Sequence, residues 1–371
     1  MLIGIPKETA PGELRAVVVP NDVARLVKLG ATVTIESGLG EGIRVTDSDY
    51  EKAGASVSTD RKALIGQSDI VLRLRKPGSD DVSLLKPGAI HISFLDPFNE
   101  KPLLQQLAAQ GASAISMELI PRTTRAQKMD ALSSQASLAG YAAVPLAAER
   151  TDRVLPMMTT PAGTINPARV FIVGVGVAGL QAIATAKRLG ARVDAFDTRP
   201  TVAEQVKSLG ARFFEIDLGE TGQTKDGYAK ALTEDQLQKQ REGMAKQCAI
   251  SDVVITTAQV FGRKAPTIIT RDMVQGMRPG SIVIDLAIES GGNVEGAELG
   301  KEIEINGVRV FGLENMPGRI AVHASQMYSA NLYNLIEEFW DKEGKLLKLD
   351  LEDDIIQGCL ITHQGAVRRE L

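Results

Sequence analysis

The sequence has 371 residues, of which 44% are hydrophobic and only 4% aromatic, with 35 glycines and a formal net charge of −4. That length exceeds one ordinary core and fits two domains, and the slight negative charge gives no reason to expect nucleic acid or a membrane surface as a partner. The N-terminus "MLIGIPKETAPGE" lacks the apolar stretch of a signal peptide, and the longest apolar run, residues 170–186, suits a buried strand and helix better than a membrane span. We therefore expect a soluble chain.

Short apolar stretches alternate with amphipathic helical patterns, which is typical of βαβ units and a parallel sheet. The expected strands of the first half are residues 1–6, 31–37, 69–75, 89–95 and 113–119, with helices at 21–30, 48–55 and 101–111. A polar stretch, residues 121–134, interrupts this rhythm. A long alanine-rich helix then begins near Gln135, with Pro145 as the expected site of a kink.

The same alternation resumes in the second half of the chain. The expected strands there are residues 168–176, 191–197, 211–217, 252–257, 281–287 and 307–313. A final amphipathic helix, residues 324–344, is expected to return to the first domain, because its apolar face must be buried somewhere. The sequence therefore predicts a first domain of residues 1–134 plus 312–371 and a second domain of residues 135–311.

Three glycines, Gly174, Gly176 and Gly179, have G-x-G-x-x-G spacing directly after an expected strand and at the start of an expected helix. The first permits a tight turn, the second lets the backbone approach a pyrophosphate, and the third lets helix and strand pack closely. The stretch "SGLGEG" at residues 37–42 lacks this spacing and is expected to be a turn. The patterns together predict an α/β fold of two Rossmann-like doubly wound parallel-sheet domains with an interdomain cleft.

An acidic residue, Asp197, ends the next expected strand, where it can accept hydrogen bonds from the adenosine ribose of a dinucleotide. A carboxylate about 4 Å from an added 2′-phosphate charge costs roughly 4 kcal/mol at an effective dielectric of ~20, which corresponds to about a thousandfold in affinity. Arg199 could reduce that penalty by pairing with the phosphate. The balance favours NAD over NADP.

The polar stretch concentrates side chains suited to ligand binding. It contains Arg122, Arg125, Gln127, Asp130, Ser133 and Ser134. These residues follow an expected strand, and ligands of open α/β sheets bind beyond the carboxyl ends of strands. The alternative is a solvated linker in which Ser133 or Ser134 caps the following helix.

The segments "RAQKMDALSSQASLAGY", "GVGVAGLQAIATAKRLGA", "DGYAK", "APTIIT" and "IDLA…GGN" resemble the NAD(H)-binding component of proton-translocating NAD(P) transhydrogenase, and the resemblance covers essentially the whole chain. In that family a two-domain NAD(H) component, a membrane-spanning proton channel and an NADP(H)-binding component pass hydride between the two cofactors. The resemblance implies that this chain is the first of these. It also implies a homodimer, held in the cytoplasm at the inner membrane by its partner subunits.

The resemblance also assigns site residues. Gln127, Asp130 and Ser133 would orient the nicotinamide for hydride transfer. The implied cofactor-binding residues are Arg122, Gln127, Lys128, Met129, Asp130, Ser133, Gly174, Gly176, Val177, Gly179, Asp197, Thr198, Arg199, Gly227, Tyr228, Gln240 and Gln259. Tyr228 matches a loop that closes over bound nucleotide, whereas Gln259 departs from the apolar residue that the family carries at its position. Hydride transfer between two nicotinamide rings needs positioning rather than an acid–base pair, which agrees with the lack of an obvious one here.

The architecture also resembles alanine dehydrogenase, in which Arg15 matches a carboxylate-binding arginine. That family needs a lysine at Arg75 and a histidine at Asp96. Arginine cannot deprotonate, and an aspartate, with a reference pKa of about 3.9, is a poor proton shuttle near neutral pH. The third alternative is an NAD-sensing subunit without turnover.

The remaining titratable candidates have structural interpretations. His91 is expected in the core, His323 at a helix start, and His363 exposed in the tail. No two histidines have metal-ligand spacing, so the sequence predicts no metal. Cys248 and Cys359 match no metal or redox motif, which favours a reducing compartment.

Overall fold

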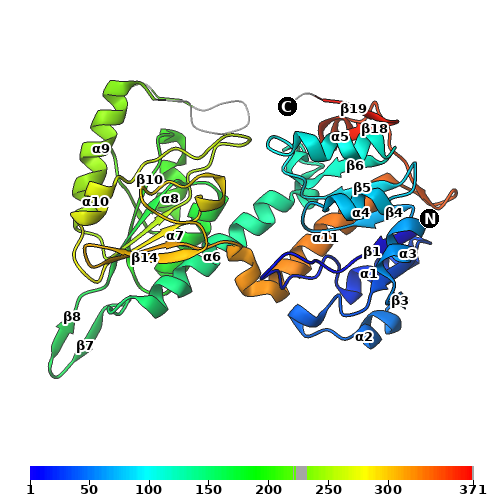
Figure 1. Cartoon of the computed structure of the whole chain (residues 1–371). Coiled ribbons are helices and arrows are strands. Elements are labelled where there is room, and N and C mark those ends of the chain that lie inside the picture. Colours follow the sequence, from blue (N-terminus) through cyan, green and yellow to red (C-terminus); the bar gives the residue numbers. More distant parts are fainter. Residues whose placement is uncertain (220, 223–231, 370–371) are drawn as a thin grey trace. The chain divides into compact units, whose positions relative to one another are not determined.

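The computed structural model describes residues 1–219, 221–222 and 232–369. The chain divides into two compact units, one formed by Met1–Gln135 with Gly318–Leu371 and the other by Ala136–Pro317 (Figure 1). The first boundary falls inside helix α6 (Ala131–Arg150), which begins four residues before the expected start at Gln135. Pro145 lies inside this helix.

Unit 1 is built on an eight-stranded sheet in the order β19-β18-β6-β5-β4-β1-β2-β3. Its strands are β1 (Leu2–Ile5), β2 (Thr32–Glu36), β3 (Ser56–Ser58), β4 (Ile70–Leu72), β5 (Ile90–Ser93), β6 (Ser113–Ser116), β18 (Leu360–His363) and β19 (Ala366–Val367). Strands β1 to β6 pair in parallel in the order 3-2-1-4-5-6, which is the order of a Rossmann fold. The C-terminal strand β18 extends this sheet antiparallel to β6.

The helices of unit 1 are α1 (Pro20–Lys28), α2 (Asp47–Lys52), α3 (Arg61–Gln67), α4 (Ser79–Leu84), α5 (Lys101–Ala109), α11 (Ala321–Phe339) and α12 (Asp354–Cys359). A short hairpin, β16 (Trp340–Asp341) with β17 (Leu346–Leu347), follows α11. Helix α11 returns to the N-terminal segment, because Ser325 and Ser329 accept hydrogen bonds from the backbone N–H groups of Ala16 and Val19. The expected turn at residues 37–42 is confirmed, with the 3₁₀ turn Glu41–Ile43 at its end.

Unit 2 is built on a seven-stranded sheet in the order β11-β10-β9-β12-β13-β15-β14. Its strands are β9 (Arg169–Val173), β10 (Arg192–Phe196), β11 (Arg212–Phe213), β12 (Val253–Thr256), β13 (Ile282–Asp285), β14 (Lys301–Ile305) and β15 (Val308–Gly312). Its helices besides the main part of α6 are α7 (Val177–Arg188), α8 (Ala203–Ser208), α9 (Glu234–Ala249) and α10 (Arg271–Gln275). All strands but the edge strand β14 pair in parallel, so this sheet repeats the 3-2-1-4-5-6 order.

The alternation of side chains along the strands explains why unit 2 has helices on both faces of its sheet. In β9, Val170 and Ile172 belong to one apolar cluster, whereas Phe171 and Val173 belong to another. Successive side chains of a strand point to opposite faces, so each face is buried under its own helices, as the continuous apolar runs of parallel strands require. The first cluster lies under α6 and α7, where a Cβ on Gly140 would come within 2.1 Å of the carbonyl oxygen of Ala178.

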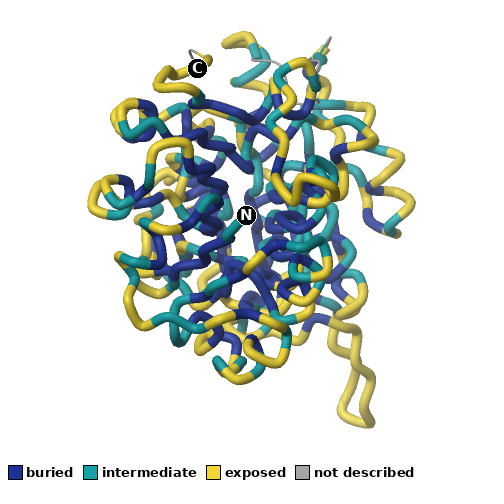
Figure 2. The backbone as a smooth tube through the Cα atoms, turned by 90° about the vertical axis from the view of Figure 1, so that its right-hand side faces the viewer, coloured by how far each residue is buried: buried dark blue, intermediate teal, exposed yellow. Residues whose placement is uncertain are grey.

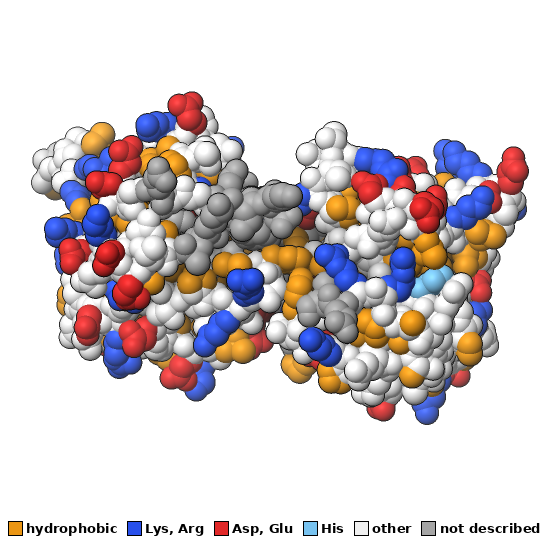
Figure 3. All heavy atoms as spheres, turned by 90° about the horizontal axis from the view of Figure 1, so that it is seen from above, with side chains coloured by type: hydrophobic (Ala, Val, Ile, Leu, Met, Phe, Trp, Pro, Cys, Tyr) orange, Lys and Arg blue, Asp and Glu red, His pale blue; other side chains and the backbone are white. Residues whose placement is uncertain are grey.

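These features confirm the α/β fold with parallel-dominated sheets and two domains. Several elements were not expected from the sequence. They include the short strand β3, the antiparallel edge strand β14, the C-terminal strands β18 and β19, and the hairpin β7 (Met158–Thr160) with β8 (Gly163–Ile165). Every residue of β7 and β8 is exposed, and the hairpin extends away from the sheet of unit 2 (Figures 1 and 2). Basic and acidic side chains are intermingled on the face of each unit that is visible in Figure 3.

Candidate functional site

The glycine-rich turn lies at the point where the strand order of unit 2 reverses. Strand β9 has β10 on one side and β12 on the other, and the turn Gly174–Gly176 connects β9 to α7. Gly174 has a φ of 93°, and a Cβ there would lie 2.7 Å from Thr257 Oγ1. A Cβ on Gly179 would lie 1.9 Å from the carbonyl oxygen of Gly174. Both glycines are therefore required by close approach of strand, turn and helix.

Gly176 differs from the other two glycines. Its φ of −88° suits any residue, and a Cβ built on it meets no atom of the described residues within 4 Å, so neither the backbone nor packing within the chain requires glycine here. Because Gly176 directly precedes α7, that open space lies at the helix N-terminus, where unpaired backbone N–H groups and the helix dipole favour an anion. The turn therefore fits the pyrophosphate of a dinucleotide, because the open space beside Gly176 lets the phosphates approach the protein backbone.

Asp197 follows β10 and lies beside this turn. Its carboxylate accepts hydrogen bonds from the Val175 N–H (2.8 Å) and from the Arg199 N–H (2.9 Å). The Arg199 guanidinium also pairs with it through Nε and Nη2, at 2.8 and 2.7 Å. The carbonyl of Thr198 accepts a hydrogen bond from Thr221 Oγ1 at 2.6 Å.

The other residues implied for nucleotide binding are placed as follows. Val177, the first residue of α7, is 44% exposed, and Gln240 is buried on α9. Gln259 is exposed, and its side-chain amide donates to the carbonyl of Leu286 at 3.2 Å. Gly227 and Tyr228 lie outside the described residues.

Sequence reasoning did not find the network that holds the loops after β12 and β13. The buried Asn293 side chain donates to the carbonyls of Ala258 and Pro266, both at 2.8 Å, and accepts from the Ala258 N–H at 3.0 Å. Asp285, whose pKa is raised by burial, accepts from the backbone N–H of Asn293 at 2.7 Å. These bonds fix the loop next to the glycine-rich turn. The "IDLA…GGN" segment carries both residues and was the available signal.

In the polar stretch of unit 1, Asp130 caps helix α6. Its carboxylate accepts hydrogen bonds from the backbone N–H of Ser133 (2.9 Å) and from Ser133 Oγ (2.6 Å). The linker alternative named Ser133 or Ser134 as the cap, which is wrong, because Asp130 fills that role and Ser134 Oγ instead donates to Asn331 at 2.7 Å. Asp130 and Ser133 are thus brought together, as a site would require, but their contact is also explained by capping.

Several other residues of this stretch contact α11 and the segment around α12. Lys128 pairs with Glu338 at 2.8 Å and its carbonyl accepts from two asparagines of α11, while Met129 is fully buried. Arg125 pairs with Asp353 at 2.6 Å. Arg122 and Gln127 are exposed. Lys128, Met129 and Arg125 hold the stretch against α11 and α12.

The corresponding switch point of unit 1, between β1 and β4, is closed by the chain itself. Glu8 follows β1, and its buried carboxylate pairs with Arg73 at 2.9 Å. It also accepts from the backbone N–H groups of Leu74 (2.7 Å) and Arg75 (3.1 Å), just after β4. The sequence "PKETAPGE" that follows β1 is not glycine-rich. In unit 1 the Glu8 carboxylate therefore occupies the position that corresponds to the glycine-rich turn of unit 2.

A second buried carboxylate, Glu13, lies between two arginines. Arg15 contacts it at 2.6 Å and Arg75 at 2.8 Å, and its side chain is fully buried. Burial raises the pKa of Glu13, but the hydrogen bonds and charges of Arg15 and the hydrogen bond of Arg75 outweigh it and lower the pKa to about 2. Arg15, which matches the carboxylate-binding arginine of alanine dehydrogenase, and Arg75, at the position where that family needs a lysine, are therefore both engaged by an internal carboxylate. Asp96, at 43% side-chain exposure, lies near Lys76.

Two of the three histidines are hydrogen-bonded to serines, and both cysteines are buried. His91 is buried in β5, as expected, with its Nε2 2.9 Å from Ser93 Oγ and its pKa lowered to about 3 by burial. The expectation that His363 is an exposed tail residue is wrong, because it ends β18 and its Nδ1 lies 2.9 Å from Ser113 Oγ. His323, near the start of α11, is exposed. Cys248 and Cys359 are buried free thiols.

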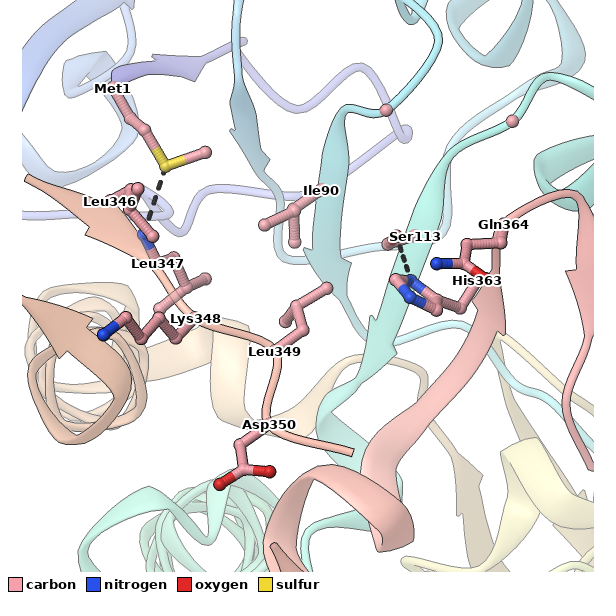
Figure 4. A pocket seen from close by; sticks show the side chains of 12 residues that line it. Met1, Ile90, Ser113, Leu346, Leu347, Lys348, Leu349, Asp350, His363 and Gln364 are labelled. Atoms are coloured by element: carbon pink, nitrogen blue, oxygen red, sulfur yellow. Dashed lines mark hydrogen bonds between the residues drawn. The ribbon is translucent and has the colours of Figure 1, made fainter. Parts of the chain in front are cut away.

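A groove of 650 Å³ in unit 1 is separate from the candidate site. Its lining includes Ile90 and Ser113, the first residues of β5 and β6, together with the segment Leu346–Asp350, His363 and Met1 (Figure 4). These positions are at the amino ends of the strands, whereas ligands of such sheets bind at the carboxyl ends. Met1 Sδ accepts from the Leu347 N–H at one edge of this groove, at 3.1 Å.

Metal clusters and membrane-spanning helices are both absent from the described part of the chain. In residues 1–219, 221–222 and 232–369, no group of three or more His, Cys, Asp and Glu side chains is arranged to hold a metal ion. Over the same ranges, no helix has the length and apolar character needed to cross a membrane.

Comparison with known proteins places the chain in a family. Residues 4–139 match the model of the alanine dehydrogenase/PNT N-terminal domain, and residues 143–370 match that of the alanine dehydrogenase/PNT C-terminal domain. One relative, the first part of NAD(P) transhydrogenase subunit alpha from Rhodospirillum rubrum, is 44% identical, over 99% of this chain and 97% of that protein. Alanine dehydrogenase of Halomonas elongata is 29% identical, over 98% and 94%.

The solved structures agree with this placement. The transhydrogenase from Sinorhizobium meliloti matches with a TM-score of 0.89 at 45% identity, over 99% of this chain and 100% of that one. An L-alanine dehydrogenase matches with a TM-score of 0.80 at 26% identity, over 99% and 97%. This chain therefore belongs to the alanine dehydrogenase/PNT family, among the relatives of the NAD(P) transhydrogenase alpha subunit.

Proposed function

We propose that this chain is the NAD(H)-binding component of a proton-translocating transhydrogenase and passes hydride between its own NAD(H) and NADP(H) on a partner subunit. The observation that carries the proposal is the contrast between the two switch points. In unit 2 the space beside Gly176 is open, and Asp197 follows the adjacent strand. In unit 1 the equivalent point is closed by the Glu8–Arg73 ion pair.

The residues of this chain would act by binding and positioning. Bound NADH would supply the hydride itself. The glycine-rich turn would hold the pyrophosphate, and Asp197 would meet the adenosine ribose. Gln127, Asp130 and Ser133 would orient the nicotinamide by hydrogen bonding, since transfer between two nicotinamides releases no proton and needs the two C4 atoms about 3–3.5 Å apart. Tyr228 would belong to a segment that closes over the nucleotide.

The proposal implies partners. They are an NADP(H)-binding subunit and a membrane-spanning proton-channel subunit, through which the chain would be attached to the inner membrane on its cytoplasmic side. The name "NAD(P) transhydrogenase subunit alpha", which several relatives carry, supports a multi-subunit complex. A second copy of the chain, forming a homodimer, is a further element of the same proposal.

Alanine oxidation is the alternative within the family, since alanine dehydrogenases match most of the chain. The geometry around Glu13 disfavours it, because Arg15 and Arg75 already pair with that carboxylate. Asp96, which occupies the position where that family needs a histidine, is partly exposed and paired with Lys76. No proton shuttle suited to neutral pH stands at that position.

Two measurements on the purified chain test the proposal. Calorimetric titration is expected to show saturable NADH binding that weakens in Asp197→Ala, and L-alanine with NAD is expected to yield no NADH. Ser208→Ala, an exposed change at the end of α8, serves as the matched control in unit 2. Alanine-dependent reduction of NAD would establish the alternative. Binding without transfer to any NADP-carrying partner would indicate an NAD sensor.

A further inference from the structure

The carboxylate of Asp197 has no acceptor position left for a ribose. A carboxylate offers about four lone-pair sites, two on each oxygen. Oδ1 accepts from the backbone N–H and the Nε of Arg199, and Oδ2 accepts from the Val175 N–H and from Nη2 of Arg199. A ribose diol can therefore bind Asp197 only if one of these donors leaves.

The donors differ in how easily they can move. The Val175 N–H belongs to the glycine-rich turn, where Val175 is buried and the flanking Gly174 is fixed by Thr257. The Arg199 N–H is part of the backbone directly after β10. The guanidinium is at the end of a flexible side chain that is 16% exposed, and its contacts include Asp197 and the Val175 carbonyl at 3.1 Å. The guanidinium is thus the group that must be displaced.

We propose that Arg199 competes internally with the nucleotide for Asp197 and thereby sets both the affinity for NAD(H) and its preference over NADP(H). This inference rests on the proposed nucleotide site in unit 2. For NADH, displacement breaks the ion pair and returns only neutral hydroxyl donors to Asp197. A nucleotide with a 2′-phosphate instead gives the displaced guanidinium a new anionic partner, with which arginine pairs well.

The consequence is an opposite effect of one substitution on two ligands. Removing the guanidinium frees Asp197 for the ribose, so NADH should bind more tightly. The same change removes the counter-charge of a 2′-phosphate and leaves Asp197 to repel it, so NADPH should bind more weakly. A residue that merely supports the fold would change both affinities in the same direction.

The test titrates the full chain with NADH and with NADPH, comparing wild type, Arg199→Gln and Arg199→Lys. Arg199→Gln is expected to lower the Kd for NADH by on the order of tenfold, the value of one charge-assisted hydrogen bond, and to raise that for NADPH. Arg199→Lys keeps the positive charge without the bidentate contact, so its NADPH affinity should stay closer to that of wild type than the affinity of Arg199→Gln does. Arg199→Met replaces Arg199→Gln if thermal melting shows the latter misfolded.

Two results would overturn the inference while leaving the nucleotide site intact. In the first, Arg199→Gln binds both NADH and NADPH more weakly than wild type does. Arg199 would then be a supporting contact for both nucleotides. In the second, the affinity for both ligands is unchanged. Failure of the wild type to bind NADH would remove the proposed function itself, and the inference with it.

Discussion

Exchanging single glycines in the nucleotide turn should separate binding from stability. Gly176 and Gly179 are three residues apart, yet a Cβ on Gly176 meets no described atom within 4 Å, whereas one on Gly179 lies 1.9 Å from the Gly174 carbonyl oxygen. Gly176→Ala therefore adds a methyl group only to the space that we assign to the pyrophosphate. Gly179→Ala forces the first turn of α7 away from the strand.

The magnitudes follow from these contacts. At Gly176, alanine is a poorer N-cap than glycine by about 0.5 kcal/mol, but it also restricts the unfolded chain by a similar amount, so the free energy of unfolding should change by less than ~0.5 kcal/mol. At Gly179, overpacking against backbone should cost about 1–3 kcal/mol. NADH affinity should fall at least ~10-fold in Gly176→Ala, equivalent to about 1.4 kcal/mol, because the backbone can no longer approach the phosphates.

Thermal unfolding without ligand and NADH titration of both variants measure these quantities. The expected pattern is a wild-type melting temperature with weakened binding for Gly176→Ala, and a lowered melting temperature for Gly179→Ala. Wild-type NADH affinity in Gly176→Ala would contradict the assignment of the pyrophosphate to this turn, because it would mean that no ligand occupies the open space. A destabilised Gly176→Ala would mean that this space is not open in solution.

Three further predictions address other regions of the chain. The pKa of Glu13 is lowered from 4.5 to about 2 in the folded protein, so its charged form stabilises the fold by about 3 kcal/mol above pH 4.5, and this stabilisation is lost as the pH falls toward 2. Glu13→Gln should therefore have a lower free energy of unfolding than wild type at pH 7, measured by urea titration. A difference in unfolding free energy that did not narrow below pH 4.5 would contradict this. Cys248 and Cys359, whose pKa values burial raises to about 12, should react with a thiol reagent only after unfolding; rapid labelling of the native chain would count against their burial. Gln127→Ala should slow hydride transfer to a partner much more than it weakens NADH binding, and equal losses would reduce Gln127 to a binding contact.

The regions of the fold that were predictable follow from strong periodic signals. Apolar strands such as β9 and β12 are buried on both faces, so their sequences are continuous and easily recognised. The edge strand β14 has the sequence "KEIEI" with mostly exposed charges, and the hairpin β7–β8 is exposed throughout, so neither carries a strong burial pattern. His363 was misplaced because it lies on a short C-terminal strand that pairs with a distant segment of the chain.

The candidate site was predictable where local spacing determines the geometry. Gly174, Gly176 and Gly179 are close in sequence, so their roles follow from the motif. Pairings between distant residues left no such signal: Glu8 reaches the backbone after β4 only because β1 and β4 are adjacent in the sheet. The engagement of Asp197 by Arg199 was not anticipated either, since a sequence shows a carboxylate but not whether its acceptor sites are occupied.

The proposed reaction passes hydride directly from one nicotinamide ring to the other, and isotope labelling measures this transfer. The chain, loaded with NADH carrying deuterium on the transferable C4 position, is mixed with an NADP-loaded partner subunit in ordinary water, and the NADPH formed is analysed by mass spectrometry. Full retention of deuterium in NADPH is the predicted result, because no titrating side chain takes part in the proposed transfer. Loss of the label to water, or no NADPH with any NADP-carrying partner while alanine reduces NAD, would contradict it.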